Sequence, residues 1–497
     1  MAATTADLDF YQDILARDPG CAPVRAQLAA ALLAAGEADA AIAAADQALA
    51  ADPSLTQGWL TRAEAHKRLH AYAAAAADLE HADVLAPGRA PILLALGTAY
   101  AEVDRLAEAE ACLRRAVACD PASAAASASL GSVLVRRGRF QPAEAECRRT
   151  LALAPDLRAA HQNLAGLLGH TRPEEARTHR DAAYRDQQVF IEPAARAERT
   201  VLVPTVADIG NIPLRHLLPR SRTTLIRWYV DYATPDQDHA LPDYDLIFNA
   251  IGDADQMPRL PPAAARLFAA PPRPLLNPPE LVARTGRADL PGLLSGIQGI
   301  VVPEAVRVAP GAIPTGPLPG LVRPIGAHGG DGVRRVETPA ALAAVLAETG
   351  PAYLTRFVES RGADGWYRKY RAIFVDRAPY AYHLAIARDW LVHYWTAGME
   401  QDAARRAEEA RFLADPAGVL GAAGMAALAA IGARLDLDFA GIDFTLLPDG
   451  RLLVFEANAT MLVHPEGEPV FAYRNPAVAH ILDAFEAMLA RRLAAAG

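Results

Sequence analysis

Two carboxylates and one carboxamide near the C-terminal end of the sequence could bind a metal ion. The dipeptide Asp449-Gly450 lies between two apolar segments and predicts a two-residue hairpin turn. Counting outward from that turn places Asp443 opposite Glu456, with Asn458 on the same face because side chains alternate along a strand. Carboxylates directly opposite each other repel unless a positive charge lies between them. Oxygen ligands of this kind suit Mg²⁺, which binds few carboxylates together with phosphate oxygens.

The same count fixes the rest of the predicted hairpin. It pairs Leu447 with Leu452 and Thr445 with Val454. The oxygen ligands are therefore predicted at one end of a well-packed hairpin, and a solvent-facing acidic hairpin is the alternative. The face opposite the ligands is apolar and is expected to be buried: Ile442, Phe444, Leu446, Leu453, Phe455 and Ala457.

A glycine-rich segment upstream could bind an anion. Backbone without Cβ atoms can bring several N–H groups onto a phosphate. Arg323, on a short apolar strand just before the glycines, would add a guanidinium whose fork matches phosphate. The spacing is that of neither a Rossmann nor a Walker loop, and an ordinary glycine-rich hairpin is the alternative. The candidate loop residues are Gly326, His328, Gly329, Gly330 and Gly332.

Three further apolar segments predict strands between the glycine-rich loop and the hairpin. They are Pro351–Glu359, Tyr367–Val375 and Ala378–Ile386. The second carries two basic residues, Lys369 and Arg371, which lie on one face because they are two positions apart. Solvated strand residues are the alternative for both.

Together these motifs resemble the ATP-grasp superfamily, whose members are ATP-dependent ligases. The clearest match is an Asp on one strand followed by Glu-x-Asn at the end of the next, which implies that Asp443, Glu456 and Asn458 bind Mg²⁺. The glycine-rich segment resembles the family's flexible loop, which implies that Arg323 and Gly326–Gly332 hold the phosphates of ATP. The resemblance covers roughly residues 200–490.

The resemblance also assigns roles to two of the other strands. Arg371 matches an arginine that faces an acyl phosphate, and Lys369 is a second candidate for that role. The family's hinge strand, whose backbone meets the adenine edge, is matched by Thr355, Arg356, Phe357 and Val358. The sequence departs from the family pattern at three places: Arg323 replaces the usual Lys, Thr355-Arg356 replaces a common Gln-Glu, and Ala459-Thr460 replaces a frequent Pro-Gly.

The first part of the chain repeats itself every 34 residues. Proline ends a helix, and a 34-residue period is typical of helix–turn–helix repeats. The unit Ala90–Ser123 resembles the tetratricopeptide repeat, with Leu96-Gly97 and Tyr100 on its first helix. We predict one leading helix within residues 1–20, about five helix pairs from Ala22, and a polar closing helix. The prolines in phase are Pro19, Pro53, Pro87, Pro121 and Pro155.

The predicted architecture therefore has three domains. Residues 1–190 form an all-α tetratricopeptide-repeat solenoid. Residues 198–305 form a small α/β domain like the one that precedes an ATP-grasp fold, with a helix expected over Leu290–Gly299. Residues 306–497 form an α+β ATP-grasp domain, closed by a helix over Pro476–Leu493.

The composition of the chain limits the kinds of partner that the protein is expected to bind. A formal net charge of −9 without any Lys/Arg-rich block argues against nucleic acid or an anionic membrane surface. No uninterrupted apolar run reaches the ~20 residues of a spanning helix, and no signal peptide is evident at the start. The cysteines show no metal-site spacing and are expected to be small buried packing residues of a cytoplasmic protein: Cys21, Cys112, Cys119 and Cys147.

The expected function is that of an ATP- and Mg²⁺-dependent ligase. It would activate a carboxylate as an acyl phosphate for attack by an amine or another nucleophile, on a peptide or protein segment held at the concave surface of the repeats. Three alternatives stay open: a ligase for small metabolites, whose repeats serve assembly such as homo-oligomerisation, a kinase-like phosphotransferase, and a non-catalytic adaptor with a degenerate nucleotide site. His383 and His464 are acid/base candidates, although an isolated histidine is more often structural.

Overall fold

The computed structural model describes residues 5–169, 171–311, 317–326, 330, 332–394 and 396–495. The chain forms two compact units. The first comprises Met1–Arg199 and Pro219–Leu225, and the second comprises Thr200–Leu218 and Ile226–Gly497. The boundary near residue 199 agrees with the predicted end of the repeats, but the return of residues 219–225 to the first unit was not predicted.

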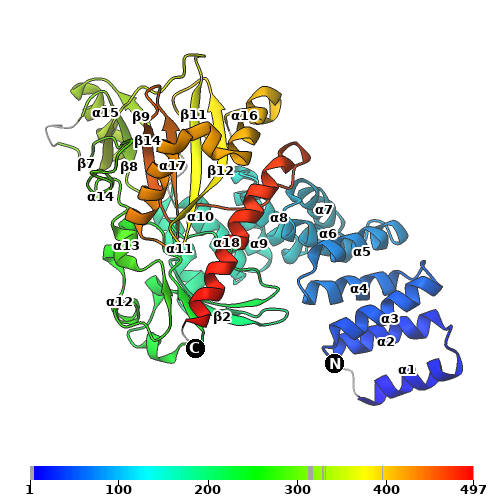
Figure 1. The fold of residues 1–497 in the computed structure, drawn as a ribbon. Coiled ribbons are helices and arrows are strands. Elements are labelled where there is room, and N and C mark those ends of the chain that lie inside the picture. The colour runs from blue at the N-terminus through cyan, green and yellow to red at the C-terminus, as the bar shows by residue number, and fades with distance from the viewer. Residues whose placement is uncertain are drawn as a thin grey trace. The chain divides into compact units, whose positions relative to one another are not determined.

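The first unit consists mainly of antiparallel helix pairs, each packed on the next. One leading helix and five pairs match the predicted number (Figure 1). A short strand, β1 (Val189–Glu192), follows the last helix. The helices are α1 (Thr5–Arg17), α2 (Ala22–Ala34), α3 (Ala38–Ala51), α4 (Thr56–Arg68), α5 (Tyr72–Leu85), α6 (Ala90–Glu102), α7 (Leu106–Cys119), α8 (Ala124–Arg136), α9 (Phe140–Leu153), α10 (Arg158–Leu168) and α11 (Pro173–Tyr184).

Small residues let the two helices of a pair approach closely. A Cβ on Gly97 of α6 would lie 2.6 Å from Cγ of Leu113 on α7. A Cβ on Gly131 of α8 would lie 2.9 Å from Sγ of Cys147 on α9. Cys112 and Cys147 are buried as predicted, but the prediction is wrong for Cys119, which is exposed because it ends α7.

The second unit begins with a small α/β part. Its strands lie in the order β3-β2-β4-β5, and both β2–β4 and β4–β5 are parallel, in line with the predicted alternation of strands and helices. The predicted helix over Leu290–Gly299 is wrong after Leu293, because Gly296 and Gly299 take positive φ values that a helix does not allow. The elements are β2 (Arg199–Thr205), β3 (Thr223–Tyr229), β4 (Leu246–Phe248), α12 (Pro262–Ala269), β5 (Leu275–Leu276), α13 (Pro279–Ala283) and α14 (Leu290–Leu293).

Two further sheets make up the rest of the second unit. A four-stranded antiparallel sheet has the order β7-β10-β8-β9 and packs against α15 through Val322, Leu342, Leu346 and Leu354. A five-stranded sheet has the order β12-β11-β13-β14-β6, antiparallel except for β6 beside β14. The elements are β6 (Ile300–Val301), β7 (Ala305–Val308), β8 (Gly320–Pro324), β9 (Arg334–Val336), α15 (Pro339–Thr349), β10 (Ala352–Arg356), β11 (Tyr367–Val375), β12 (Ala378–Ala387), α16 (Ala403–Ala414), α17 (Pro416–Leu435), β13 (Phe439–Leu446), β14 (Leu452–Asn458) and α18 (Asn475–Ala494).

The turn between β13 and β14 differs from the prediction. Leu446 pairs with Leu452, one position away from the predicted Leu447–Leu452 pair. The N–H of Gly450 donates to the carbonyl of Leu447 at 2.9 Å, and Gly450 has a φ of +83°. This is a three-residue loop that ends in a left-handed glycine, favoured by Pro448 at its first position.

A β-bulge corrects the register further along the same hairpin. The pairing shifts between Phe444, opposite Val454, and Asp443, opposite Glu456. Phe455 is the extra residue and is 38% exposed, so the prediction that it is buried was wrong. The predicted facing of Asp443 and Glu456 is confirmed, because the longer loop and the bulge offset each other.

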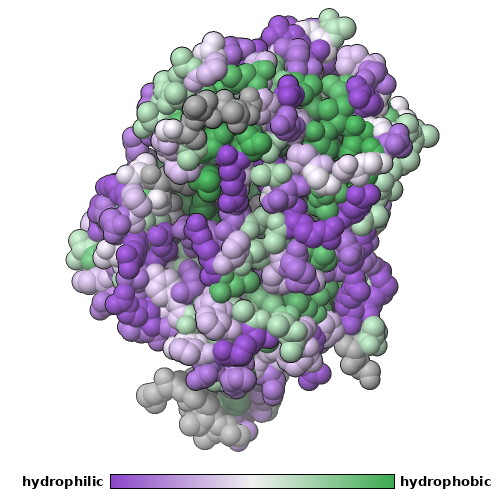
Figure 2. All heavy atoms as spheres, turned by 90° about the vertical axis from the view of Figure 1, so that its left-hand side faces the viewer, coloured by the Kyte–Doolittle hydropathy of each residue, from purple (hydrophilic) through white to green (hydrophobic). Residues whose placement is uncertain are grey.

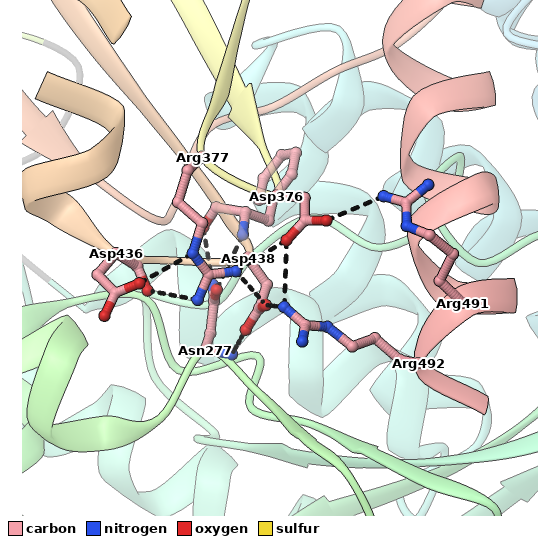
Figure 3. A network of polar contacts seen from close by, with 8 residues as sticks. Asn277, Asp376, Arg377, Asp436, Asp438, Arg491 and Arg492 are labelled. Carbon is pink, nitrogen blue, oxygen red and sulfur yellow. Dashed lines mark hydrogen bonds and ion pairs between the residues drawn. The ribbon is translucent and has the colours of Figure 1, made fainter. Parts of the chain in front are cut away.

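A network of polar contacts joins four segments of the second unit (Figure 3). The buried side chain of Asn277, after β5, bonds both backbone groups of Phe439: Nδ2 donates to the carbonyl at 2.8 Å, and Oδ1 accepts from the N–H at 2.9 Å. The backbone N–H of Asn277 donates to Asp438 at 2.9 Å. Arg377, in the turn between β11 and β12, donates to the same carboxylate, and so does Arg492 of α18.

Helix α17 is the one helix within the described residues that is long and apolar enough to cross a membrane, judged by length and composition only. The expectation concerned an uninterrupted apolar run of ~20 residues, and Arg434 interrupts this helix before that length is reached. The helix packs against the five-stranded sheet: a Cβ on Gly432 would lie 2.7 Å from the ring of Phe374 on β11. Its buried residues recur at spacings of three and four: Leu420, Gly424, Ala427, Leu428, Ile431, Gly432 and Leu435.

Partly exposed hydrophobic side chains also occur at the surface of the second unit. In the space-filling view, hydrophobic atoms gather in the upper half of the visible face and are separated by a hydrophilic strip (Figure 2). Large side chains that are 37–39% exposed are Ile325, Leu391, Phe455 and Leu462.

Candidate functional site

Four chemically active side chains form one row across the five-stranded sheet. His383 on β12 pairs with Arg371 on β11, Arg371 pairs with Asp443 on β13, and Asp443 pairs with Glu456 on β14. Directly paired residues of neighbouring strands present their side chains on the same face. The sheet therefore brings the predicted residues Arg371, Asp443 and Glu456 together.

Asp443 is buried and neutralised by two cations. Arg371 binds it with both arms of its guanidinium, with Nε 2.6 Å from Oδ1 and Nη2 2.9 Å from Oδ2. Nζ of Lys369 lies 3.2 Å from Oδ2. Burial alone would raise the pKa of the Asp443 carboxyl, but the charges of Arg371 and Lys369 outweigh burial and hold that pKa well below its usual range.

Glu456 has a different cationic partner. Nη1 of Arg287, in the loop after α13, lies 2.7 Å from Oε2 of Glu456. Burial opposes ionisation of Glu456, whereas the charges of Arg287 and then Arg323 favour it, and its pKa falls to about 2. Sequence analysis missed Arg287, which is 169 positions from its partner and belongs to no recognisable motif.

Arg323 completes the group from the other sheet. It lies on β8, close enough for the charges of Arg287, Glu456 and Asp443 to change its pKa. The described residues offer its side chain no hydrogen bond or ion pair, although its backbone pairs with Tyr353 in the sheet. Burial, and then the like charge of Arg287, lower the pKa of its guanidinium. Arg287, Arg323, Lys369 and Arg371 give four positive charges against the two of Asp443 and Glu456, so this charged cluster has a net charge of +2.

The three predicted Mg²⁺ ligands carry oxygen donors and lie on one strand pair, where Asp443 pairs with Glu456 and Asn458 lies two positions further along β14. Oδ1 of Asn458 accepts hydrogen bonds from the N–H and hydroxyl of Thr460 at 3.0 and 2.9 Å. The described residues contain no group of three His, Cys, Asp or Glu that could hold a metal ion. A Mg²⁺ ion on Asp443, Glu456 and Asn458 would therefore need further oxygens from a ligand, as is usual for Mg²⁺ beside phosphate. Arg371, Lys369 and Arg287, which now pair with Asp443 and Glu456, would then have to pair with other anions.

The glycine-rich loop is described in part. Gly326, Gly330 and Gly332 all have positive φ values, between +68° and +89°, which favour glycine. A Cβ on Gly330 would lie within 3.8 Å of Leu391 and His393, so the loop approaches the segment after β12. The candidates His328 and Gly329 lie outside the described residues.

The predicted hinge strand is β10, at the centre of the four-stranded sheet. Thr355 pairs with Ala305 on one side and Leu321 on the other. The N–H of Arg356 donates to the carbonyl of Glu304, and that of Phe357 donates to Pro319, both at 2.8 Å. The N–H groups of these two candidates are therefore engaged within the protein, so base recognition would rest on Val358 and on carbonyl oxygens.

The two candidate histidines differ in environment. His383 is buried, and burial together with the charge of Arg371 holds the pKa of its imidazole well below the usual range. His464 contacts the carbonyl of Pro465 through Nδ1, and its backbone N–H donates to the hydroxyl of Tyr382 at 3.4 Å. A neutral His383 beside Arg371 adds no charge to the cluster.

A cleft of about 50 Å³ lies next to the charged cluster. It is bounded by the loop after β4, the loop after α13, β10, and the end of β14, and Gly326 and Asn458 reach its wall. Its other polar lining residues are Thr460, which the sequence analysis noted only as a departure from the family pattern, and five that it did not single out: Asp253, Asp255, Thr285, Arg287 and Tyr353.

Comparison with known proteins identifies the repeats. Tetratricopeptide-repeat family models match residues 4–64 and 90–123. The N-terminal region is thus a tetratricopeptide-repeat domain, and both matches lie within it. No curated protein matches the chain.

Three solved structures illustrate the similarity, each over about a third of this chain. The first is YrrB, described as a TPR protein with an unusual peptide-binding site, with 20% identity over 35% of this chain and 90% of its own and a TM-score of 0.33. The second is MamA, with 25% identity, coverage of 31% and 90%, and a TM-score of 0.30. The third is pilF of Pseudomonas aeruginosa, with 22% identity, coverage of 34% and 77%, and a TM-score of 0.30.

Proposed function

We propose that the second unit is an ATP-grasp ligase that activates a carboxylate with ATP. The observation that carries this proposal is the charged cluster, with its excess of positive charge and an Arg323 guanidinium that makes no hydrogen bond or ion pair with a described residue. A buried excess of two positive charges favours a multiply charged anion such as a triphosphate. Arg323 and Asp443 come from two different sheets, so a nucleotide bound at the charged cluster would contact both.

The roles of the residues follow from their contacts. Bound Mg²⁺ would offset the negative charge of the phosphates, which is its usual contribution to phosphoryl transfer. Asp443, Glu456 and Asn458 would hold the ion. Arg371, Lys369 and Arg323 would then be available to hold phosphate oxygens, with the forked geometry of arginine orienting the transferred group.

The proposed reaction has two steps. A carboxylate oxygen forms a bond to the γ-phosphorus of ATP, the bond to the bridging oxygen breaks, and ADP leaves with the electron pair. An amine or other nucleophile then attacks the carbonyl carbon, phosphate leaves with its electron pair, and the nucleophile loses a proton. The chain's contribution is to position the reactants and stabilise charge, and no side-chain nucleophile is required.

The repeats suggest where the acceptor binds. Stacked helix pairs form an extended concave surface of the kind that binds polypeptide segments. We therefore propose a peptide or protein as the acceptor, and four free cysteines suit a reducing, cytoplasmic location. The intact charged cluster favours this enzyme over a non-catalytic adaptor, and a product that keeps its phosphate would instead indicate a phosphotransferase.

Nucleotide binding tests the proposal directly. Calorimetry of the full chain with Mg²⁺ and a non-hydrolysable ATP analogue should show binding that Arg323→Met weakens at least tenfold, because hydrogen bonds to charged groups contribute about 1.5–3 kcal/mol each. Arg451→Met is the matched control, since Arg451 is exposed at the turn of the hairpin, away from the charged cluster. Absence of binding by folded wild type, or equal binding by Arg323→Met, would refute the proposal.

A further inference from the structure

Two histidines join the closing helix of the first unit to the helix before it. Nδ1 of His161, on α10, lies 2.8 Å from Nδ1 of His179, on α11. We propose that these imidazoles form a proton-operated latch, which holds α11 against α10 while one of the two facing nitrogens is unprotonated and releases it when both carry a proton. The latch belongs to the first unit and involves none of the residues of the charged cluster.

The contacts of His161 fix which nitrogens carry protons. Nε2 of His161 lies 2.8 Å from the carbonyl oxygen of Pro155, which can only accept, so Nε2 carries the proton of the neutral ring. Nδ1 of His161 then accepts, and Nδ1 of His179 donates. The separation of 2.8 Å suits this hydrogen bond. It is too short for two ligands of one tetrahedral Zn²⁺, whose nitrogens would lie about 3.3 Å apart.

The histidine pair can take up one further proton without losing its bond, but not two. A single added proton can occupy Nε2 of His179, which lies 4.0 Å from Oε1 of Glu175, and the bond between the Nδ1 atoms stays intact. A second added proton places an N–H on both facing nitrogens. The hydrogen bond is then lost, and two positive charges face each other in its place.

The surroundings of His179 oppose its protonation. The side chain of His179 is 13% exposed. Burial, followed by the charge of a protonated His161, lowers the pKa of its imidazole. Arg148 of α9 lowers this pKa further, whereas Glu175 of α11 raises it. The attraction of Glu175 is shared, because its carboxylate also pairs with Arg148 and with Arg172, just before α11.

The latch should therefore weaken as the solution becomes acidic. The unfolded chain takes up protons near the ordinary histidine pKa of 6.5, before the folded His179 does. The stability that the latch provides is complete above that pH and is lost as the pH falls below it.

We expect this loss to be local to the end of the repeats. In a solenoid each repeat contacts only its neighbours, so the last helix has a repeat on one side only. The segment after α11 has a separate attachment to α10, where Arg158 lies 4.7 Å from the ring centre of Phe190 and donates to Gln187 at 2.9 Å. Protonation of both histidines would therefore free α11 while the interior helix pairs stay packed.

Hydrogen exchange of the full chain, followed by mass spectrometry, tests the latch. We expect the protection of Pro173–Tyr184, corrected for the intrinsic effect of pH on exchange, to fall about tenfold from pH 7.5 to pH 5, as a pKa shift of about one unit implies. The interior pair α6–α7 should keep its protection. His179→Asn should abolish the fall, because Nδ2 of asparagine can donate to His161 and never becomes charged. His161→Asn should also abolish it, because Oδ1 of asparagine can accept from His179.

His81→Asn is the matched control, because His81 is exposed and stacks on Trp59. This variant should behave as wild type does. Equal protection of α11 at both pH values in wild type, or a fall that persists in both asparagine variants of the latch, would overturn the proposal. Loss of protection at pH 7.5 in both of those variants would also overturn it, because the imidazoles would then act by packing and not through their protons.

Discussion

Asp443 cannot lose its charge without affecting two buried cations. Asp443→Asn would leave Arg371 and Lys369, which are about 20% exposed, without their shared partner. Breaking a buried ion pair from one side costs about 3–5 kcal/mol, so we expect the unfolding free energy of the second unit to fall by about that amount. Urea unfolding followed by near-ultraviolet circular dichroism measures this change. A loss below 1 kcal/mol would show that water hydrates Arg371 and Lys369 well enough to replace the charge of Asp443.

Glu456 should make the unfolding free energy of the second unit depend on pH in the acidic range. Its pKa of about 2 lies below the ordinary value near 4.5, so the unfolded chain takes up a proton first as the pH falls. The contribution of Glu456 to stability is therefore full above about pH 4.5 and is lost as the pH falls toward 2. Unfolding free energies measured from pH 5 to pH 2.5 should decline less steeply in Glu456→Gln than in wild type. Parallel pH profiles would contradict the ion pair with Arg287.

At the scale of residues, the sequence predicts contacts within one motif and misses contacts across the fold. The facing of Asp443 and Glu456 follows from strand alternation on both sides of one turn. Arg287 and the cleft depend on how loops far apart in sequence pack together, and nothing local encodes that. The sequence shows which residues of the loop are glycines, but the binding of an anion by these glycines remains a prediction.

The network in Figure 3 shows how elements hold one another at strained positions. Four of the six non-glycine residues with positive φ in the described chain belong to it: Asn277, Asp376, Arg377 and Asp436. Such backbone costs roughly 1–2 kcal/mol per residue, except for Asn and Asp, which tolerate it better. Arg377, with a φ of +70°, is the one of the four that is neither Asn nor Asp, and its bonds to Asp436 and Asp438 offset the cost of that backbone conformation.

Asn277 provides the sharpest test of that network. Asn277→Ala removes both side-chain bonds to the backbone of Phe439, and it replaces Asn, which tolerates the positive φ of 51°, with a residue that does not. We expect the second unit to lose about 2–5 kcal/mol of unfolding free energy, since an unpaired buried group costs about 1–3 kcal/mol. Asn277→Gly is the matched control, because it removes the same bonds but relieves the strain. A smaller loss in glycine than in alanine separates the two contributions, and no loss in either would contradict the role of Asn277.

Elements were predicted well where periodicity was strong and poorly where glycine intervened. The sequence pattern located β13 and β14, yet the turn is one residue longer than predicted because Gly450 takes the left-handed conformation at its third position. Phe455 then bulges outward, which no alternation pattern indicates. Two local errors cancelled, so Asp443 and Glu456 face each other as predicted although the predicted register was wrong near the turn.

At the scale of the molecule, a substitution in one unit should leave the other unit's chemistry intact. A Cβ at Gly97 would lie 2.6 Å from Cγ of Leu113, so Gly97→Ala should cost the repeats about 1–3 kcal/mol through overpacking. Far-ultraviolet circular dichroism should show earlier melting of the helices, while calorimetry shows unchanged nucleotide binding. Gly166→Ala is the matched control, because Gly166 lies in α10 without a positive φ and a Cβ there would have no neighbouring atom within 4 Å. Lost nucleotide binding in Gly97→Ala would mean that the two units are coupled.

The number of repeats could be predicted from the sequence, but the course of the chain between its two units could not. A 34-residue period counts the helix pairs because each pair must bury its face against the next. The return of Pro219–Leu225 to the first unit carries no such signal, because it depends on contacts rather than on pattern.

The return of residues 219–225 to the first unit limits how a gene rearrangement could exchange the repeats. The chain passes between its units three times: after Arg199, after Leu218 and after Leu225. A gene rearrangement with one breakpoint near residue 199 would transfer the repeats without the seven residues that complete their unit, and would leave those residues stranded in the other product. A breakpoint beyond residue 225 would instead carry residues 200–218 of the second unit away with the repeats, so no single breakpoint at this junction separates the two units intact.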